Sequence, residues 1–149
     1  MTKFLLAVHV IAAIVAVGPV TVAASLFPPA ARKVLAEPGD AQALAITRLL
    51  HRICRVYATV GVVVPVFGFA TASNMGVLGD AWLITSIVLT ALAAVVLAAL
   101  VLPRQSALLE GPGDRAATVR LAMFTGIFNL LWATVTVLMI VRPGSTTGA

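Results

Sequence analysis

The chain has 149 residues, of which 61% are hydrophobic and only 10% are charged, and its net charge is +5. About a quarter of the residues of a soluble domain are charged, so this composition excludes a protein surrounded mainly by water. The single cysteine excludes an internal disulfide and a cysteine cage for a metal, and two histidines are too few for most all-protein metal sites. The composition therefore argues against an autonomous hydrolase or metalloenzyme.

Four uncharged stretches divide the chain, and each is near or above the ~20 apolar residues that a helix needs to cross a bilayer. With the helix starts derived below, we expect spans at about residues 4–27, 41–72, 81–103 and 115–141, in one integral membrane domain over residues 1–149. The predicted fold class is all-α, a bundle of four transmembrane helices. Pro19 and Pro65 are expected to kink their helices.

The first stretch shares features with a secretory signal, because Lys3 precedes an apolar run and residues 22–25 are small. The run is longer than the ~7–15 apolar residues of such signals. Cleavage would also leave the five cations of the next segment outside the membrane, against the usual charge bias. We therefore expect a retained helix.

The cations lie almost entirely in the two segments that follow the first and third stretches. Only Lys3 and Arg142 lie elsewhere. The eight others are Arg32, Lys33, Arg48, Arg52, Arg55, Arg104, Arg115 and Arg120. Because Lys and Arg in short loops face the cytoplasm, we expect cytoplasmic loops at 28–40 and 104–114, both termini outside, and a location in the plasma membrane. The lipid bilayer explains this charge, so no nucleic-acid partner is expected.

The two basic segments resemble each other. One reads LFPPAARKVLAEPGD and the other VLPRQSALLEGPGD, and each has a proline (Pro28, Pro103) where the preceding helix is expected to end. Aspartate is a favoured N-cap, so the second and fourth helices are expected to begin at Ala41 and Arg115. One interpretation is a duplicated helical hairpin. The other is that any cytoplasmic loop favours Pro, Gly and Asp.

A helix from residue 41 to 71 would be ~46 Å long, well beyond the ~30 Å hydrocarbon core. Its projecting part, AQALAITRLLHRICR, places a basic stripe at spacings of three and four, formed by Arg48, His51, Arg52 and Arg55. Three interpretations are open. The arginines reach lipid headgroups and fix the helix depth, or they bind an anionic lipid or phosphorylated metabolite, or they dock an acidic partner subunit.

His9 lies in the first stretch, where an imidazole is by default a functional hypothesis and could ligate haem, copper or a quinone headgroup. Its depth should differ from that of His51 by ~20 Å or more, so the two cannot share one haem. No cofactor is therefore expected, with haem kept as an alternative. The other interpretation is a hydrogen bond between helices, with three candidate partners, Thr85, Ser86 and Asn74.

Asn129 lies near the middle of the fourth stretch, in FTGIFNLLWAT. An amide at this depth must find an internal partner or cost several kcal/mol. Thr125 and Trp132 share its face by helical spacing, which predicts that this face points into the bundle. A hydrogen bond between helices and a contact to a ligand are the two interpretations.

The opening LLAVHVIAAIVAVG resembles that of predicted integral membrane proteins of unknown function common in actinobacteria. Its LxxHVxAA pattern is also similar to the first helix of the copper-resistance D-type membrane proteins and of the haem-binding membrane protoporphyrinogen oxidase family. The resemblance implies a four-helix fold and identifies His9 with the first-helix histidine of those families. They usually continue with Trp and a Gly-Gly pair, where this chain has Gly18-Pro19.

We expect a non-enzymatic accessory or structural subunit, or a homo-oligomer, because catalytic groups are scarce and small residues for close helix packing are abundant. Its partner would be another membrane protein or a second copy of itself. The alternative is a binder or carrier of haem, a quinone or an anionic lipid. No catalytic or metal-ligating residue is expected, and the candidate binding residues are His9, Arg48, His51, Arg52, Arg55 and Asn129.

Overall fold

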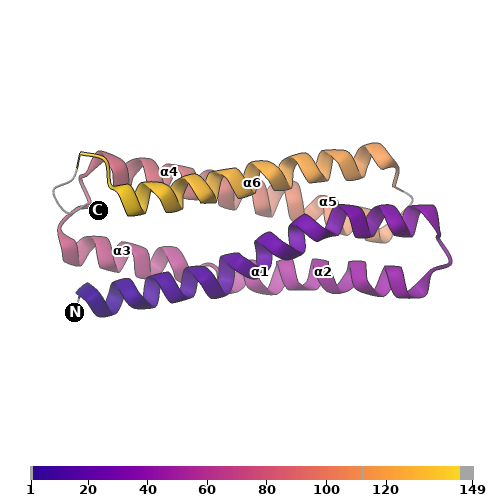
Figure 1. The fold of residues 1–149 in the computed structure, drawn as a ribbon, viewed down its shortest axis with the longest axis horizontal. Helices are drawn as coiled ribbons and strands as arrows, with labels where there is room; N and C mark the ends of the chain where they lie inside the picture. The colour runs from indigo at the N-terminus through magenta and orange to yellow at the C-terminus, as the bar shows by residue number, and fades with distance from the viewer. Residues whose placement is uncertain (1, 112, 145–149) are drawn as a thin grey trace.

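The computed structural model describes residues 2–111 and 113–144, and within these ranges all regular structure is helical. The elements are α1 (Thr2–Ala36), α2 (Ala41–Val60), α3 (Val63–Met75), α4 (Ala81–Val95), the π-helical segment η1 (Val96–Val101), α5 (Leu102–Glu110) and α6 (Arg115–Val141). They form four long rods that lie side by side, namely α1, α2–α3, α4–η1–α5 and α6 (Figure 1). The predicted all-α fold is confirmed.

Each of the four rods is long and apolar enough to cross a membrane. Their bounds are Thr2–Ala36, Ala41–Met75, Ala81–Glu110 and Arg115–Val141. Large apolar side chains cover the outside of the bundle, and Phe4 and Leu130 are 66% and 71% exposed. Such a surface suits hydrocarbon, in which helices satisfy their own backbone hydrogen bonds.

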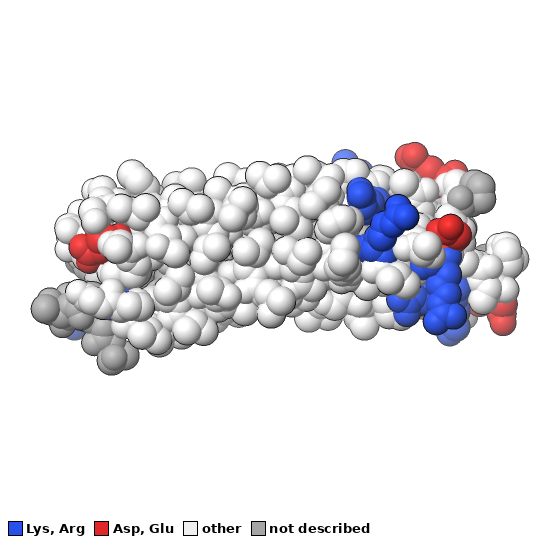
Figure 2. Space-filling model, turned by 90° about the horizontal axis from the view of Figure 1, so that it is seen from above, with Lys and Arg blue, Asp and Glu red and all other residues white. Residues whose placement is uncertain are grey.

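Charge separates the two ends of the bundle. The start of α1 and the end of α6 lie at one end of the bundle, and the end of α1 and the starts of α2 and α6 lie at the other (Figure 1). Figure 2 shows Lys and Arg side chains gathered near the end at which α2 and α6 begin. We refer to this end as the charged end and to the opposite one as the terminal end.

Both predicted caps form at the charged end. The carboxylate of Asp40 accepts a hydrogen bond from the backbone N–H of Ala43 at 3.1 Å, and that of Asp114 accepts one from Ala117 at 2.8 Å. Each bond satisfies an N–H group that the first turn of a helix leaves unpaired. Helices α2 and α6 accordingly begin where the sequence predicts.

The expected helix ends at Pro28 and Pro103 are wrong. Helix α1 continues through Pro28 and Pro29 to Ala36, and α5 continues past Pro103 to Glu110, so the expected loops 28–40 and 104–114 are mostly helical. A proline removes one helical N–H and crowds the preceding turn. Here the buried packing of Phe27 and Pro28 offsets that cost, and α1 bends near its middle without breaking (Figure 1).

The second rod is interrupted, whereas one helix over 41–72 was expected. A turn at residues 61–62 separates α2 from α3, just before Pro65. Because Pro65 has no N–H, the carbonyl of Gly61 loses its usual helical donor and accepts from the N–H of Val64 at 3.1 Å. The sequence therefore predicted the place of this distortion but not its size.

The main hydrophobic core lies in the charged half and joins all four rods. Its fully buried members include Phe27 from α1, Cys54 from α2, Val101 from η1 and Leu121 from α6. Helix α1 packs against α2 and α3 on one side and against α6 on another, while α4 packs against α6. The contact between α1 and α6 joins the first helix to the last and positions the site described next.

Candidate functional site

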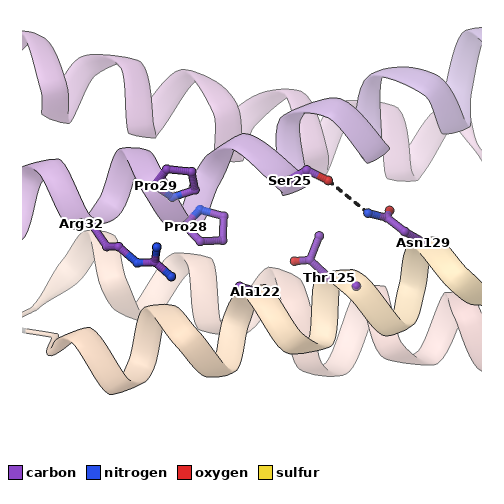
Figure 3. A pocket seen from close by; sticks show the side chains of 8 residues that line it. Ser25, Pro28, Pro29, Arg32, Ala122, Thr125 and Asn129 are labelled. Atoms are coloured by element: carbon purple, nitrogen blue, oxygen red, sulfur yellow. Dashed lines mark hydrogen bonds between the residues drawn. The ribbon is translucent and has the colours of Figure 1, made fainter.

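A groove of about 210 Å³ opens between α1 and α6 in the charged half of the bundle (Figure 3). Its walls are mostly small or ring-shaped side chains, which leave space between two helices that otherwise touch. The lining residues are Ser25, Pro28, Pro29 and Arg32 of α1 and Ala122, Thr125, Gly126 and Asn129 of α6.

Arg32 marks the end of the groove that is nearer the charged end. Its Nε donates to the hydroxyl of Thr118 at 3.1 Å, and that hydroxyl donates to the carbonyl of Arg115 at 2.7 Å. The residues that line the groove are uncharged apart from Arg32. Arg32 has no ion pair within the described part of the chain. One edge of the guanidinium is thus anchored to α6, while the terminal nitrogens keep their capacity to bind an anion.

Asn129 lies at the other end of the groove, farther from the charged end. Its Nδ2 donates to the hydroxyl of Ser25 at 3.1 Å and so ties α6 to α1 (Figure 3). Its Oδ1 is buried without a partner, as is the hydroxyl of Thr125, a residue only 2% exposed. A buried polar group without a hydrogen bond is destabilising, and such groups are rare in native structures.

The unpaired atoms are concentrated along one seam of the bundle. Besides the two in the groove, the buried side-chain atoms without a partner are the hydroxyl of Thr21 and the indole nitrogen of Trp132. Within the described ranges, all four atoms belong to α1 or α6. The buried polar side-chain atoms without a partner are therefore found in the two helices that pack against each other at the groove, which we call the α1–α6 seam, and not throughout the bundle.

Two prolines change the regular hydrogen bonding of α1 beside the groove. In a helix the carbonyls of Ala24 and Ser25 would accept from the residues four positions later, which are Pro28 and Pro29. Proline has no N–H to donate, so neither carbonyl can receive its regular helical hydrogen bond. The irregular backbone at this point of α1 lies beside the groove, which Ser25, Pro28 and Pro29 line.

The structure divides the predicted basic stripe. Arg48, Arg52 and Arg55 are exposed on α2, and Arg52 and Arg55, together with His51, line a shallow hollow of about 510 Å³. His51 was expected on the same stripe, but it is 8% exposed and its ring packs edge-on against Phe27 at 6.3 Å. His51 thus borders the same hollow as Arg52 and Arg55, as the stripe predicts, but its ring is mostly buried and hydrogen-bonds to α5.

His51 belongs instead to a buried polar cluster that joins α2 to α5. Its Nδ1 donates to Oε1 of Gln105 at 2.8 Å, and Gln105 Nε2 donates to the sulfur of Cys54 at 3.7 Å. This pairing leaves His51 Nε2 as the acceptor, with the hydroxyl of Ser106 at 3.4 Å. Gln105 is fully buried. We refer to His51, Gln105 and Cys54 as the α2–α5 cluster.

His9 bonds to a backbone carbonyl rather than to one of the three expected side chains. Its Nδ1 lies 2.9 Å from the carbonyl oxygen of Val64. The predicted hydrogen bond between helices is therefore present, but its partner differs, because α1 packs against α3, whose Gly68 leaves room for the imidazole, whereas Thr85 and Ser86 belong to α4. His9 lies near the terminal end and His51 in the charged half, so the structure does not bring the two histidines together.

Replacing Gly68 by alanine is expected to destabilise the protein by about 1–3 kcal/mol, because overpacking forces its neighbours to move. The new Cβ would lie 2.8 Å from Cε1 and 3.1 Å from Nδ1 of His9. Thermal unfolding in detergent, followed by circular dichroism, measures this change. Gly18→Ala is the matched control, since a Cβ there meets nothing within 4 Å. Equal melting temperatures for the two variants would contradict the expectation.

Metal chemistry finds little support in the geometry. Within the part of the chain that the structure describes, no group of three or more His, Cys, Asp or Glu side chains could hold a metal ion.

No protein-family model matches the chain, and no curated protein or solved structure matches it significantly. The candidate site therefore rests on the geometry of this chain alone.

The sequence predictions included Asn129 and placed Thr125 on the same helix face, but they missed the side of the groove that α1 forms. A signal was present, because Ser25, Pro28, Pro29 and Arg32 recur at spacings of three and four and so share one face of a helix. That face could be recognised only by treating residues 28–36 as helical. Gln105 was missed for the same reason, since it lies beyond Pro103 in a segment that was expected to be a loop.

Proposed function

We propose that this protein binds an anionic membrane amphiphile in the α1–α6 groove, with the acidic group of the ligand on Arg32. The observation that carries the proposal is one groove that combines Arg32 and the buried hydroxyl of Thr125, which have, respectively, no ion pair and no hydrogen-bond partner among residues 2–111 and 113–144. A guanidinium pairs with carboxylate or phosphate through charge-assisted hydrogen bonds. The groove lies on a bundle with an apolar exterior, so its occupant would arrive from the bilayer.

The ligand would satisfy the polar atoms that the fold leaves unpaired. Asn129 and Thr125 both line the groove, and we expect a rotation of either side chain to bring its buried polar atom to a ligand. Ser25 can accept from or donate to Asn129, so a flip of the amide would keep the bond between the helices. Small rotations would thus open the site without moving a helix.

The proposed membrane is the plasma membrane, with the charged end in the cytoplasm and the groove at the inner leaflet. Eight of the ten cations support this orientation. An impermeant maleimide should label Gly79→Cys in intact cells and Gly39→Cys only after permeabilisation. Both glycines have open space around them, and the native Cys54 is buried, so the parent chain serves as the unlabelled control. The reverse labelling pattern would overturn the orientation.

The main test compares two arginines of the charged half. Arg32→Gln should reduce the anionic lipid that co-purifies with the protein at least tenfold, because the groove loses its charge and its bidentate donor. Native mass spectrometry of protein extracted from its own membrane measures retention. Arg120→Gln is the control, since Arg120 is exposed on α6 and does not line the groove. Equal retention by the two variants would exclude the proposed site.

A second candidate function is that of a non-enzymatic accessory subunit or homo-oligomer. The observation in its favour is a row of exposed small residues on the outer side of the third rod, at Ala91, Ala94 and Ala98. Small residues of this kind allow close helix–helix approach within a membrane. A strictly monomeric protein in lipid nanodiscs, with no co-purifying protein, would remove this candidate.

A further inference from the structure

A second concave surface lies on α2, apart from the α1–α6 groove. It is the hollow of about 510 Å³ lined by His51, Arg52, Arg55, Val56 and Thr59, and it shares no residue with the groove. None of these side chains is acidic, and helix α2 contains neither Asp nor Glu. The hollow therefore presents two arginines to an occupant, with no carboxylate among the lining residues to pair with them.

The guanidinium groups of Arg52 and Arg55 are not used inside the fold. Both side chains are exposed, and among residues 2–111 and 113–144 neither guanidinium has an ion pair, a hydrogen bond or an aromatic contact. By contrast, the guanidinium of Arg104 lies over Phe124, 4.7 Å from the ring centre. Arg52 and Arg55 are three residues apart and so are neighbours on the helix surface, where like charges repel. An anion between them would offset this repulsion and accept charge-assisted hydrogen bonds from both.

The hollow lies where the basic part of the second rod meets its apolar part. Arg55 directly precedes the uncharged stretch of residues 56–79. Because this rod is long and apolar enough to cross a membrane, the two arginines come to lie at the depth of the lipid phosphates. Toward the terminal end, the exposed side chains of Val56 and Val60 follow one turn apart on the same face. A lipid with its phosphate on the arginines could lay a hydrocarbon chain along these valines, which favours a lipid over a free phosphate.

We propose that this hollow binds a phospholipid whose head is a phosphomonoester, with the phosphate between Arg52 and Arg55. A phosphomonoester carries a charge of about −1.5 to −2 at pH 7 and has three acceptor oxygens, so it can pair with both guanidiniums. A phosphodiester has one negative charge shared by two oxygens. This site is additional to the α1–α6 groove and does not rest on the proposed function. Because the hollow is shallow, its lipid should exchange with the bilayer and be lost on extraction.

A fluorophore beside the hollow can report on such a lipid within a bilayer. Val60 is exposed and Cys54 is buried, so a thiol-reactive bimane would label the Val60→Cys variant and leave the parent chain unlabelled. Nanodiscs of phosphatidylcholine would receive phosphatidic acid or phosphatidylglycerol with a nitroxide on one acyl chain, because a nitroxide quenches bimane on contact. A label at Val95→Cys, exposed on α4, gives the background from lipid that meets the bundle elsewhere.

Phosphatidic acid should reach half-maximal quenching at a mole fraction at least fivefold lower than phosphatidylglycerol. Arg52→Gln and Arg55→Gln should each raise the mole fraction for phosphatidic acid at least fivefold, since each removes a charge and a forked donor. Arg48→Gln is the matched control, because Arg48 is exposed on the same helix but does not line the hollow. It should change the value less than twofold. Native mass spectrometry of the delipidated chain and its arginine variants, titrated with the same two lipids, provides a measurement without the Val60 substitution.

Each other outcome overturns a stated part of the proposal. If Arg48→Gln weakens binding as much as Arg52→Gln, the arginines act through general attraction and the site is excluded. If the two lipids quench equally and both depend on Arg52 and Arg55, the phosphomonoester assignment is overturned. If soluble glycerol 3-phosphate displaces phosphatidic acid, the ligand is a free phosphate compound rather than a lipid. If the response is lost in Arg32→Gln instead, the lipid lies in the α1–α6 groove, so the proposed function stands and this site fails.

Discussion

Replacing Gln105 by leucine should lower the free energy of unfolding by about 2–3 kcal/mol, near the upper end of the range for an unsatisfied buried group. Gln105 is fully buried and accepts a 2.8 Å hydrogen bond from His51 while donating to Cys54. Leucine fills much of the same volume but leaves the Nδ1–H of His51 without an acceptor. Because the cluster connects α2 to α5, the loss acts on the contact between the second and third rods.

A double-mutant cycle separates the polar cost from the packing cost. His51→Phe would keep a ring against Phe27 and remove the stranded donor. In the Gln105→Leu background this second change should recover at least 1 kcal/mol, because a pair of apolar groups can replace a hydrogen-bonded pair at little cost. Chemical unfolding in mixed micelles measures all four proteins. Purely additive losses would show that the cluster contributes packing alone.

Replacing Thr125 by valine should change stability and binding in opposite directions. The Thr125 hydroxyl is buried without a partner, so a methyl group in its place is expected to stabilise the ligand-free protein by about 1–2 kcal/mol. The same change removes a polar contact from the groove and should reduce lipid retention severalfold. Melting temperature after delipidation and native mass spectrometry before it supply the two measurements.

Thr71→Val provides the comparison for this substitution. Thr71 is 4% exposed, lies on α3 outside the groove, and donates to the carbonyl of Phe67 at 2.7 Å. Since its hydroxyl is already satisfied, the valine variant should gain no stability and should retain as much lipid as the parent chain. Two valine variants with the same melting temperature and the same lipid content would refute the interpretation of Thr125 as a vacant polar contact.

The fold was predictable because two independent signals in the sequence agreed. Uncharged stretches of membrane length fixed the number of rods, and the caps at Asp40 and Asp114 fixed two helix starts. The signal that misled was proline. Local sequence indicates that Pro28 and Pro103 are poor helix residues, but it contains no information about the packing that keeps helix α1 intact through residues 28–36.

Most of the site could not be predicted, because it depends on which helices touch. The face that carries Ser25 and Arg32 becomes a groove only where α6 packs against it, and this pairing of the first helix with the last is a property of the tertiary structure. The same limit applies to His9 and His51. Each was recognised as notable from its residue type, yet the partners Val64 and Gln105 follow from the packing of α1 on α3 and of α2 on α5.

The two capped helices also explain why one seam of the bundle is filled and another is open. His51 and Thr125 lie the same number of residues after their capping aspartates, so they occupy equivalent positions in the second and fourth rods. Where α2 packs against α5, the side chain of Gln105 accepts a hydrogen bond from His51 and donates one to Cys54. Whether the basic segments are aligned on their prolines or on their aspartates, the first rod has only alanine at the place of Gln105. The contact between α2 and α5 thus receives its hydrogen bonds from Gln105, whereas under the proposed function the contact between α1 and α6 receives them from an exchangeable ligand.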